Sequence, residues 1–123
     1  MSDVPQAGWT RVRTRTGQYE YQFQGRVPAV RGGRYEDARD YQFLVMDEEG
    51  WLYKIPVRLA ADAEAELDKS ATAALAEKLR IAAAQLRQGL ENYRPRQNAP
   101  YAELDGYFAV DLERARELAR GRM

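Results

Sequence analysis

The 123-residue sequence contains no cysteine and no histidine. Without cysteine it can form no disulfide, thiolate nucleophile or cysteine metal site. Without histidine it lacks the commonest general base and the commonest metal ligand, and every Ser–His or Cys–His catalytic pair is excluded. Serine is scarce as well, since it occurs only at Ser2 and Ser70. These absences argue against a conventional hydrolase, and we expect a protein that is not an enzyme and holds no cofactor and no metal.

The sequence also lacks a long hydrophobic run. No window approaches 18 consecutive apolar residues, and the first residues, MSDVPQAG, lack the basic and apolar regions of a signal peptide. We therefore expect a cytoplasmic protein with no membrane partner. The 45% of hydrophobic and 31% of charged residues are typical of a globular chain, and the length is enough for one hydrophobic core but not for two.

The charges cancel overall, with 19 basic and 19 acidic residues, but they are unevenly distributed. Residues 1–34 contain six arginines and two acidic residues, a balance of +4. Residues 35–77 contain four basic and eleven acidic residues, a balance of −7, and residues 78–123 contain nine and six, a balance of +3. A chain with this distribution can steer a charged partner or associate with a second copy of itself.

The N-terminal part of the chain predicts a β-hairpin. Residues 9–16 alternate arginine with threonine and valine, and a turn is expected near Gly17. Residues 19–27 alternate in the same way and place four apolar side chains on one face: Tyr19, Tyr21, Phe23 and Val27. The following stretch, VPAVRGGRYEDARD (27–40), contains a proline and a pair of glycines and predicts a long connection.

A second hairpin is predicted from residues 41–46 and 51–59, joined by the turn sequence DEEG. Pro56 cannot donate a hydrogen bond to a neighbouring strand, which indicates an edge strand or a bulge at this position. After Leu59 the hydrophobic period changes from two residues to between three and four. That change predicts that a sheet comes first and that a helix then covers it.

The predicted helix spans residues 60–93 in one or two parts. Its apolar residues recur every three or four positions: Leu67, Ala71, Leu75, Leu79, Ala82, Leu86, Leu90 and Tyr93. Asp62 is the candidate cap of a short first part, and Asp68 or Ser70 is the candidate cap of the main part. We expect the stripe to pack on the sheet, while neighbouring alanines widen the apolar surface enough for a second helix to approach.

The C-terminal part begins with RPRQNAP (94–100), whose prolines end the helix. Asp105–Gly106 lies between two short apolar runs and predicts a hairpin or short strand, and residues 111–121 predict a helix with Asp111 as cap and Gly121 as end. The expected fold class is α+β: a four-stranded, mainly antiparallel sheet of two hairpins, a long amphipathic helix, then a short C-terminal strand or hairpin and helix. Residues 1–94 would form the core domain, with 95–123 as an appendage packed on it or exchanged with it.

The basic N-terminal segment is the first candidate site. Arginines two residues apart in a strand lie about 6.5–7 Å apart, which suits successive phosphates, and aromatic rings beside them suit stacking of unpaired bases. The candidate binding residues are Trp9, Arg11, Arg13, Arg15, Tyr19, Arg26, Arg31 and Arg34. The structural alternative is that arginines on an edge strand prevent the sheet from pairing with another.

Acidic residues give weaker signals. Six of them fall in two short segments: Glu36, Asp37, Asp40, Asp47, Glu48 and Glu49. Their spacing does not match a calcium-binding loop, and a solvated turn is normally rich in such residues. No pair of carboxylates is placed for catalysis, because pairs such as Glu64 and Glu66 lie on opposite sides of a helix.

We therefore expect a small, non-enzymatic interaction or adaptor protein. It would act through protein–protein contact, as a self-associating homodimer or with another protein, using the exposed aromatics of the first hairpin and the outer flank of the long helix. The alternative is a single-stranded nucleic-acid-binding protein that uses the basic, aromatic N-terminal hairpin.

Overall fold

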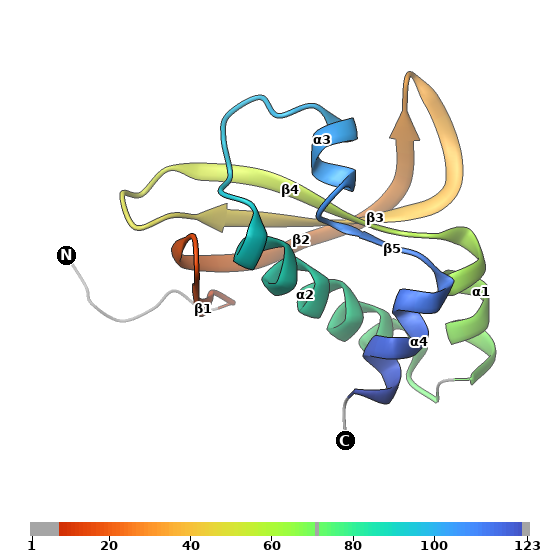
Figure 1. Ribbon diagram of the computed structural model, residues 1–123. Helices are drawn as coiled ribbons and strands as arrows, with labels where there is room; N and C mark the ends of the chain where they lie inside the picture. Colours follow the sequence, from red (N-terminus) through yellow and green to blue (C-terminus); the bar gives the residue numbers. More distant parts are fainter. Residues whose placement is uncertain (1–7, 71, 122–123) are drawn as a thin grey trace.

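The computed structural model describes residues 8–70 and 72–121 and confirms the α+β fold class (Figure 1). In this part of the chain the strands are β1 (Thr10–Thr14), β2 (Gly17–Arg31), β3 (Arg34–Met46), β4 (Leu52–Leu59) and β5 (Ala109–Val110). The helices are α1 (Ala61–Ser70), α2 (Ala74–Asn92), α3 (Tyr101–Asp105) and α4 (Leu112–Arg120). The strands form one sheet in chain order, antiparallel from β1 to β4, with β5 parallel to β4.

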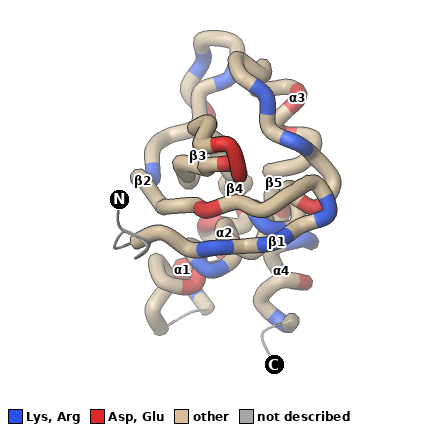
Figure 2. Tube along the Cα trace, turned by 90° about the vertical axis from the view of Figure 1, so that its left-hand side faces the viewer, with Lys and Arg blue, Asp and Glu red and all other residues tan. Residues whose placement is uncertain are grey.

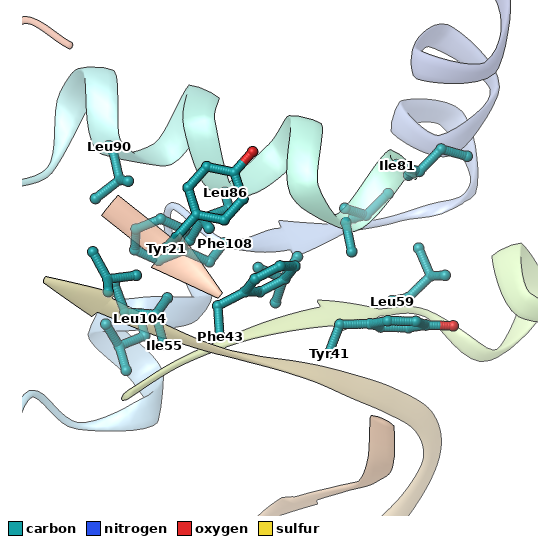
Figure 3. Close-up of a cluster of buried hydrophobic side chains, with 14 of the residues drawn as sticks. Tyr21, Tyr41, Phe43, Ile55, Leu59, Ile81, Leu86, Leu90, Leu104 and Phe108 are labelled. Carbon is teal, nitrogen blue, oxygen red and sulfur yellow. The ribbon is translucent and has the colours of Figure 1, made fainter. Parts of the chain in front are cut away.

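The hydrophobic core lies between the curled sheet and α2, which crosses one of its faces (Figure 1). Period-two alternation places Phe43 and Ile55 on that face, and the helical stripe places Leu86 and Leu90 opposite them (Figure 3). All four are almost completely buried. Burying a side chain of this size stabilises the fold by about 1.5–3 kcal/mol compared with leaving it exposed. The packing of the helix on the sheet is thus as predicted.

The helical region consists of two helices, α1 and α2, but the predicted caps are wrong. Asp62 is the second residue of α1, and α2 begins after Ala73 without a hydrogen bond from a side-chain cap. Asp68 instead accepts a hydrogen bond from Lys78 Nζ at 2.6 Å, and Ser70 Oγ donates to the carbonyl of Glu66 at 2.9 Å. Of the predicted stripe, Ala71 lies outside the described residues. Leu75, which was also expected to pack on the sheet, is 60% exposed, so the prediction is wrong at this position.

Residues 27–40 are not a long connection, as the sequence suggested, but the outer part of a β2–β3 hairpin. Arg31 pairs with Arg34, and the turn between them consists of Gly32 and Gly33, with φ of 59° and 77°. A two-residue turn in which both residues have positive φ matches the twist of the strands, and glycine adopts it without steric cost. Pro28 is tolerated because the register shifts between Pro28 and Val30.

A second irregularity changes which side chains face the core. The register of β2 shifts between Phe23 and Gly25, so that Arg26 pairs with Tyr41 and Val27 with Asp40. One extra residue reverses the alternation of a strand. The prediction that Val27 shares a face with Tyr21 is therefore wrong, and Arg26 points to the core side instead.

Up to residue 121, where the described part of the chain ends, the C-terminal segment contains a short strand but no hairpin. Gly106 ends α3, and β5 joins β4 through hydrogen bonds from Arg58 N to Phe108 O and from Ala60 N to Val110 O, both at 2.9 Å. Asp111 Oδ1 caps α4 by accepting from Arg114 N at 2.8 Å, as predicted. This segment shares the core of the sheet and α2 through four buried side chains: Leu104, Phe108, Val110 and Ala115.

Candidate functional site

The basic residues of β1 and the following turn lie on different sides of the sheet. Arg11 and Arg13 pair with Glu20 and Gln18 of β2 and are exposed on the face away from α2. Arg15 lies in the turn, where its backbone N–H donates to Glu91 Oε1 at 2.9 Å and its Nη2 donates to Asn92 Oδ1 at 2.8 Å. The positive charge thus lies at the C-terminal end of α2, which it stabilises through the helix dipole.

The other candidate residues of the basic segment are scattered. The ring of Tyr19 is buried, with 4% of the residue exposed, so its faces are not accessible to a base, and Trp9 is half-buried. Arg34 is exposed at the tip of the β2–β3 hairpin, whereas Arg26 and Arg31 are held in ion pairs. Arg11 and Arg13 lie side by side on one face of β1, and Arg31 and Arg34 are neighbours across the tip of the β2–β3 hairpin.

An acidic turn lies close to these two arginines. Figure 2 shows basic positions along β1 and acidic positions in the turn between β3 and β4. Arg11, Arg13, Glu48 and Glu49 line a common shallow hollow, and Glu48 Oε1 accepts from the backbone N–H of Gln18 at 3.2 Å. Opposite charges placed together weaken the potential that a phosphate backbone would meet.

Arg26 belongs to a polar cluster that reaches from the core to the surface, together with Tyr41, Glu64 and Lys78. Glu64 accepts hydrogen bonds from Tyr41 Oη at 2.7 Å and Arg26 Nη2 at 2.5 Å, and Lys78 Nζ lies 3.0 Å from its Oε1. Burial alone would raise the pKa of Glu64, but the hydrogen bonds from these three donors outweigh burial, and its pKa is lowered. Because every charge in the cluster has a partner, its role is structural.

Arg31 fastens the β2–β3 hairpin to α3. Its guanidinium donates to both carboxylate oxygens of Asp40 at 2.9 Å and to those of Asp105 at 2.7 and 2.9 Å. It also lies over the ring of Tyr101, 4.3 Å from the centroid. Such planar, bidentate pairing orders two segments that are 74 residues apart in the chain.

The clearest candidate binding site is a hollow beside β4, which we call the β4 hollow. It has a volume of about 470 Å³ and is lined by Leu44, Leu52, Tyr53, Lys54, Ile55, Tyr93, Pro95, Arg96, Gln97, Asn98, Ala99 and Leu104. The buried residues Ile55, Tyr93 and Leu104 form its apolar floor. The connection between α2 and α3, which passes beside β4 in Figure 1, forms the opposite wall. The volume lies in the range of ligand sites, roughly 300–1,000 Å³.

One large apolar side chain of the lining is exposed. Leu52, which lines it, is 48% exposed, and its chain neighbour Trp51 is 60% exposed. Lys54 and Arg96 are the charged residues of the lining. Arg96 Nε donates to Glu103 Oε2 at 2.9 Å, and Tyr93 Oη donates to the same oxygen. The site therefore combines an apolar floor, the exposed side chain of Leu52 and two cationic side chains.

The backbone of β4 is open along the β4 hollow. The carbonyl of Leu52 accepts a hydrogen bond from Gln97 Nε2 at 3.0 Å, and Arg58 N donates to Phe108 O at 2.9 Å, so both groups point away from β3. Residues two apart in a strand direct their backbone groups to the same edge. The N–H and C=O of Lys54 therefore point to this edge, between the side chain of Gln97 and β5.

Sequence reasoning missed the β4 hollow because its two walls are far apart in the chain: Leu52 and Gln97, which are hydrogen-bonded across it, are separated by 45 residues. Pro56 was a partial indication of the site, because it predicted an edge strand. The strand β5 pairs with Arg58 and Leu59 of β4 and leaves Leu52–Ile55 uncovered. In the sequence Trp51 directly follows the DEEG turn, so it was predicted to begin a strand, and nothing in the pattern indicated that its side chain is exposed. The pairing of β4 with β5 could not be read from local periodicity.

Two broader findings bear on function. Within residues 8–70 and 72–121, no three acidic side chains are arranged to hold a metal ion, and no helix is long and apolar enough to cross a membrane. Comparison of the chain with protein-family models, with curated proteins and with solved structures gave no match.

Proposed function

We propose that this is a non-enzymatic interaction protein that binds another polypeptide chain at the β4 hollow. The observation that carries this proposal is the apolar floor of the hollow together with the exposed Leu52 that lines it. Tryptophan, tyrosine and arginine supply most of the binding energy where protein interfaces form, and apolar side chains do so best when they fill a preformed pocket. The cytoplasmic location expected from the sequence belongs to the same proposal.

The bound chain is either a different protein or a second copy of this one. Pairing of two β1 edges is disfavoured, because an antiparallel pair centred on Val12 would place Arg11 opposite Arg13 of the second copy. Self-association would instead use the β4 hollow or the start of α2, where Leu75 is 60% exposed. The geometry favours the hollow, because it offers a concave apolar site as well as exposed side chains.

A display library of random linear peptides, selected on the immobilised full-length protein, tests this proposal. We expect enriched peptides that contain large apolar residues. Their binding should be lost with Leu52→Glu and kept with the matched control Leu75→Glu, because both leucines are exposed but one lines the hollow. Light scattering on the same samples measures whether the protein forms a homodimer. A monomer that enriches no peptide, or binding that depends on Leu75 and not on Leu52, contradicts the proposal.

Binding of single-stranded nucleic acid is the second candidate function, favoured by the adjacent, exposed Arg11 and Arg13. It predicts that a fluorescent oligonucleotide binds with an affinity that decreases as salt rises, and that replacing both arginines by glutamine flattens this dependence. The absence of salt-sensitive binding at micromolar protein concentration would exclude it.

A further inference from the structure

We propose that the segment bound at the β4 hollow is an extended, acidic peptide that adds to the sheet as a strand beside β4. This inference rests on the proposed function and specifies the chemistry of the partner and the way it is held. Addition of a strand uses backbone hydrogen bonds for affinity and alternate side chains for specificity. The β4 edge offers both.

Strand addition requires backbone groups that point to an open edge of the sheet. The N–H and C=O of Lys54 point to the open edge, as the bonds made by Leu52 and Arg58 on either side show. The short strand β5 already occupies the same edge further along, at Arg58 and Leu59. An added segment would therefore continue the line of β5. Gln97 now donates its side-chain amide to Leu52 O at 3.0 Å, which shows that a donor from this side reaches the edge.

The side chains of the segment would alternate between two environments. On the side of Ile55 they contact the floor of the β4 hollow, which includes Tyr93 and Leu104, and apolar groups are favoured there. Leu52 and Lys54 line the hollow from the opposite face of β4. On the side of Lys54 they meet its ammonium group. Among the described residues no carboxylate is within ion-pair distance of Lys54, whereas Arg96 is already paired with Glu103. Charge complementarity therefore selects an acidic residue beside Lys54.

The probe for this inference is a capped five-residue peptide of alternating leucine and glutamate, titrated into the full-length protein. We expect the Lys54 amide to become protected from hydrogen exchange by at least about tenfold, while amides on the edge of β1 that points away from β2 stay unchanged. N-methylation of the peptide should weaken binding at alternate positions and leave it unchanged between them, because every second amide faces β4.

Two variants sharpen the test. Lys54→Glu should weaken the leucine–glutamate peptide several-fold and favour a leucine–lysine peptide instead. Gln97→Ala should tighten binding, because it frees the carbonyl of Leu52. Binding that is insensitive to N-methylation at every position, or protection of β1 instead of Lys54, overturns strand addition.

The two proposals fail in different ways. If library peptides bind in a Leu52-dependent manner but N-methylation has no effect, contact at the hollow stands and strand addition is wrong. If neither the library nor the leucine–glutamate peptide binds, both are wrong.

Discussion

At the scale of single residues, Glu64 shows how this fold holds a charge inside. Its carboxylate is nearly inaccessible, with 6% of the residue exposed, and Lys78 beside it is 3% exposed. A buried carboxylate is costly unless its oxygens accept hydrogen bonds from charged or hydroxyl donors. Tyr41, Arg26 and Lys78 supply these donors from β3, β2 and α2. The cluster therefore ties α1 to the elements around it.

Replacing Glu64 by glutamine should destabilise the fold by about 2 kcal/mol, because Arg26 loses its carboxylate partner and Lys78 keeps only Asp68. Urea denaturation measures this as a lower midpoint with an unchanged slope. Glu66→Gln is the matched control on the same helix, since Glu66 pairs with Arg116 near the surface and should give a much smaller change. If the two variants lowered the denaturation midpoint equally, the buried cluster would contribute no more to stability than the surface ion pair.

Stability should also fall in acid because of Glu64. Its pKa is lowered below the ordinary value of 4.5 in the folded state, so the unfolded chain binds protons more readily. The stabilisation is present above about pH 4.5 and is lost as the pH falls through the folded-state pKa. Denaturation midpoints measured from pH 7 to pH 3 should decrease, and Glu64→Gln should make this decrease shallower. If the midpoint decreased equally with pH in both proteins, Glu64 would not be the group that causes the loss of stability.

At the scale of elements, the β2–β3 hairpin depends on its two-glycine turn. Gly33 has φ of 77°, a conformation that β-branched residues avoid. Gly33→Val should therefore cost about 1–3 kcal/mol in the free energy of unfolding. Gly25→Ala is the control in the same strand pair, because Gly25 has no positive φ and an added Cβ meets nothing within 4 Å. Chemical denaturation compares them, and a Gly33→Val protein as stable as wild type would refute the turn geometry.

The packing of α2 on the C-terminal segment depends on Gly89. A Cβ at this position would lie 2.2 Å from Phe108 Cε1 and 2.9 Å from the carbonyl oxygen of Tyr107. Alanine normally stabilises a helix relative to glycine by about 1 kcal/mol, but here overpacking should reverse the sign and destabilise by about 1–3 kcal/mol. Thermal unfolding of Gly89→Ala measures this. The exposed neighbour Gln88→Ala should change stability by no more than about 0.5 kcal/mol.

The elements could be predicted where the hydrophobic period was regular. The sheet strands, the helix that covers them and the cap at Asp111 followed from local patterns. The predictions failed at irregularities, because the bulge after Phe23 reverses the alternation and the Gly32–Gly33 turn shortens what looked like a loop. Both features depend on strand pairing, which a single strand's pattern does not contain.

At the scale of the whole molecule, the uneven charges of the sequence are partly paired within the fold. Arg26 and Arg31 of the basic N-terminal part meet Glu64 and the carboxylates of Asp40 and Asp105. The candidate site was harder to foresee than the fold, because the β4 hollow forms between β4 and a connection that follows α2. Only the tertiary arrangement brings the exposed Leu52 to the apolar floor.

Chemical-shift mapping tests the central claim most directly. The leucine–glutamate peptide is titrated into isotopically labelled full-length protein, and the perturbed amides are located. Perturbations concentrated in residues 52–55 and 93–99 would match the proposed site. Perturbations concentrated on β1 or on the exposed start of α2, or none at millimolar peptide, would contradict it.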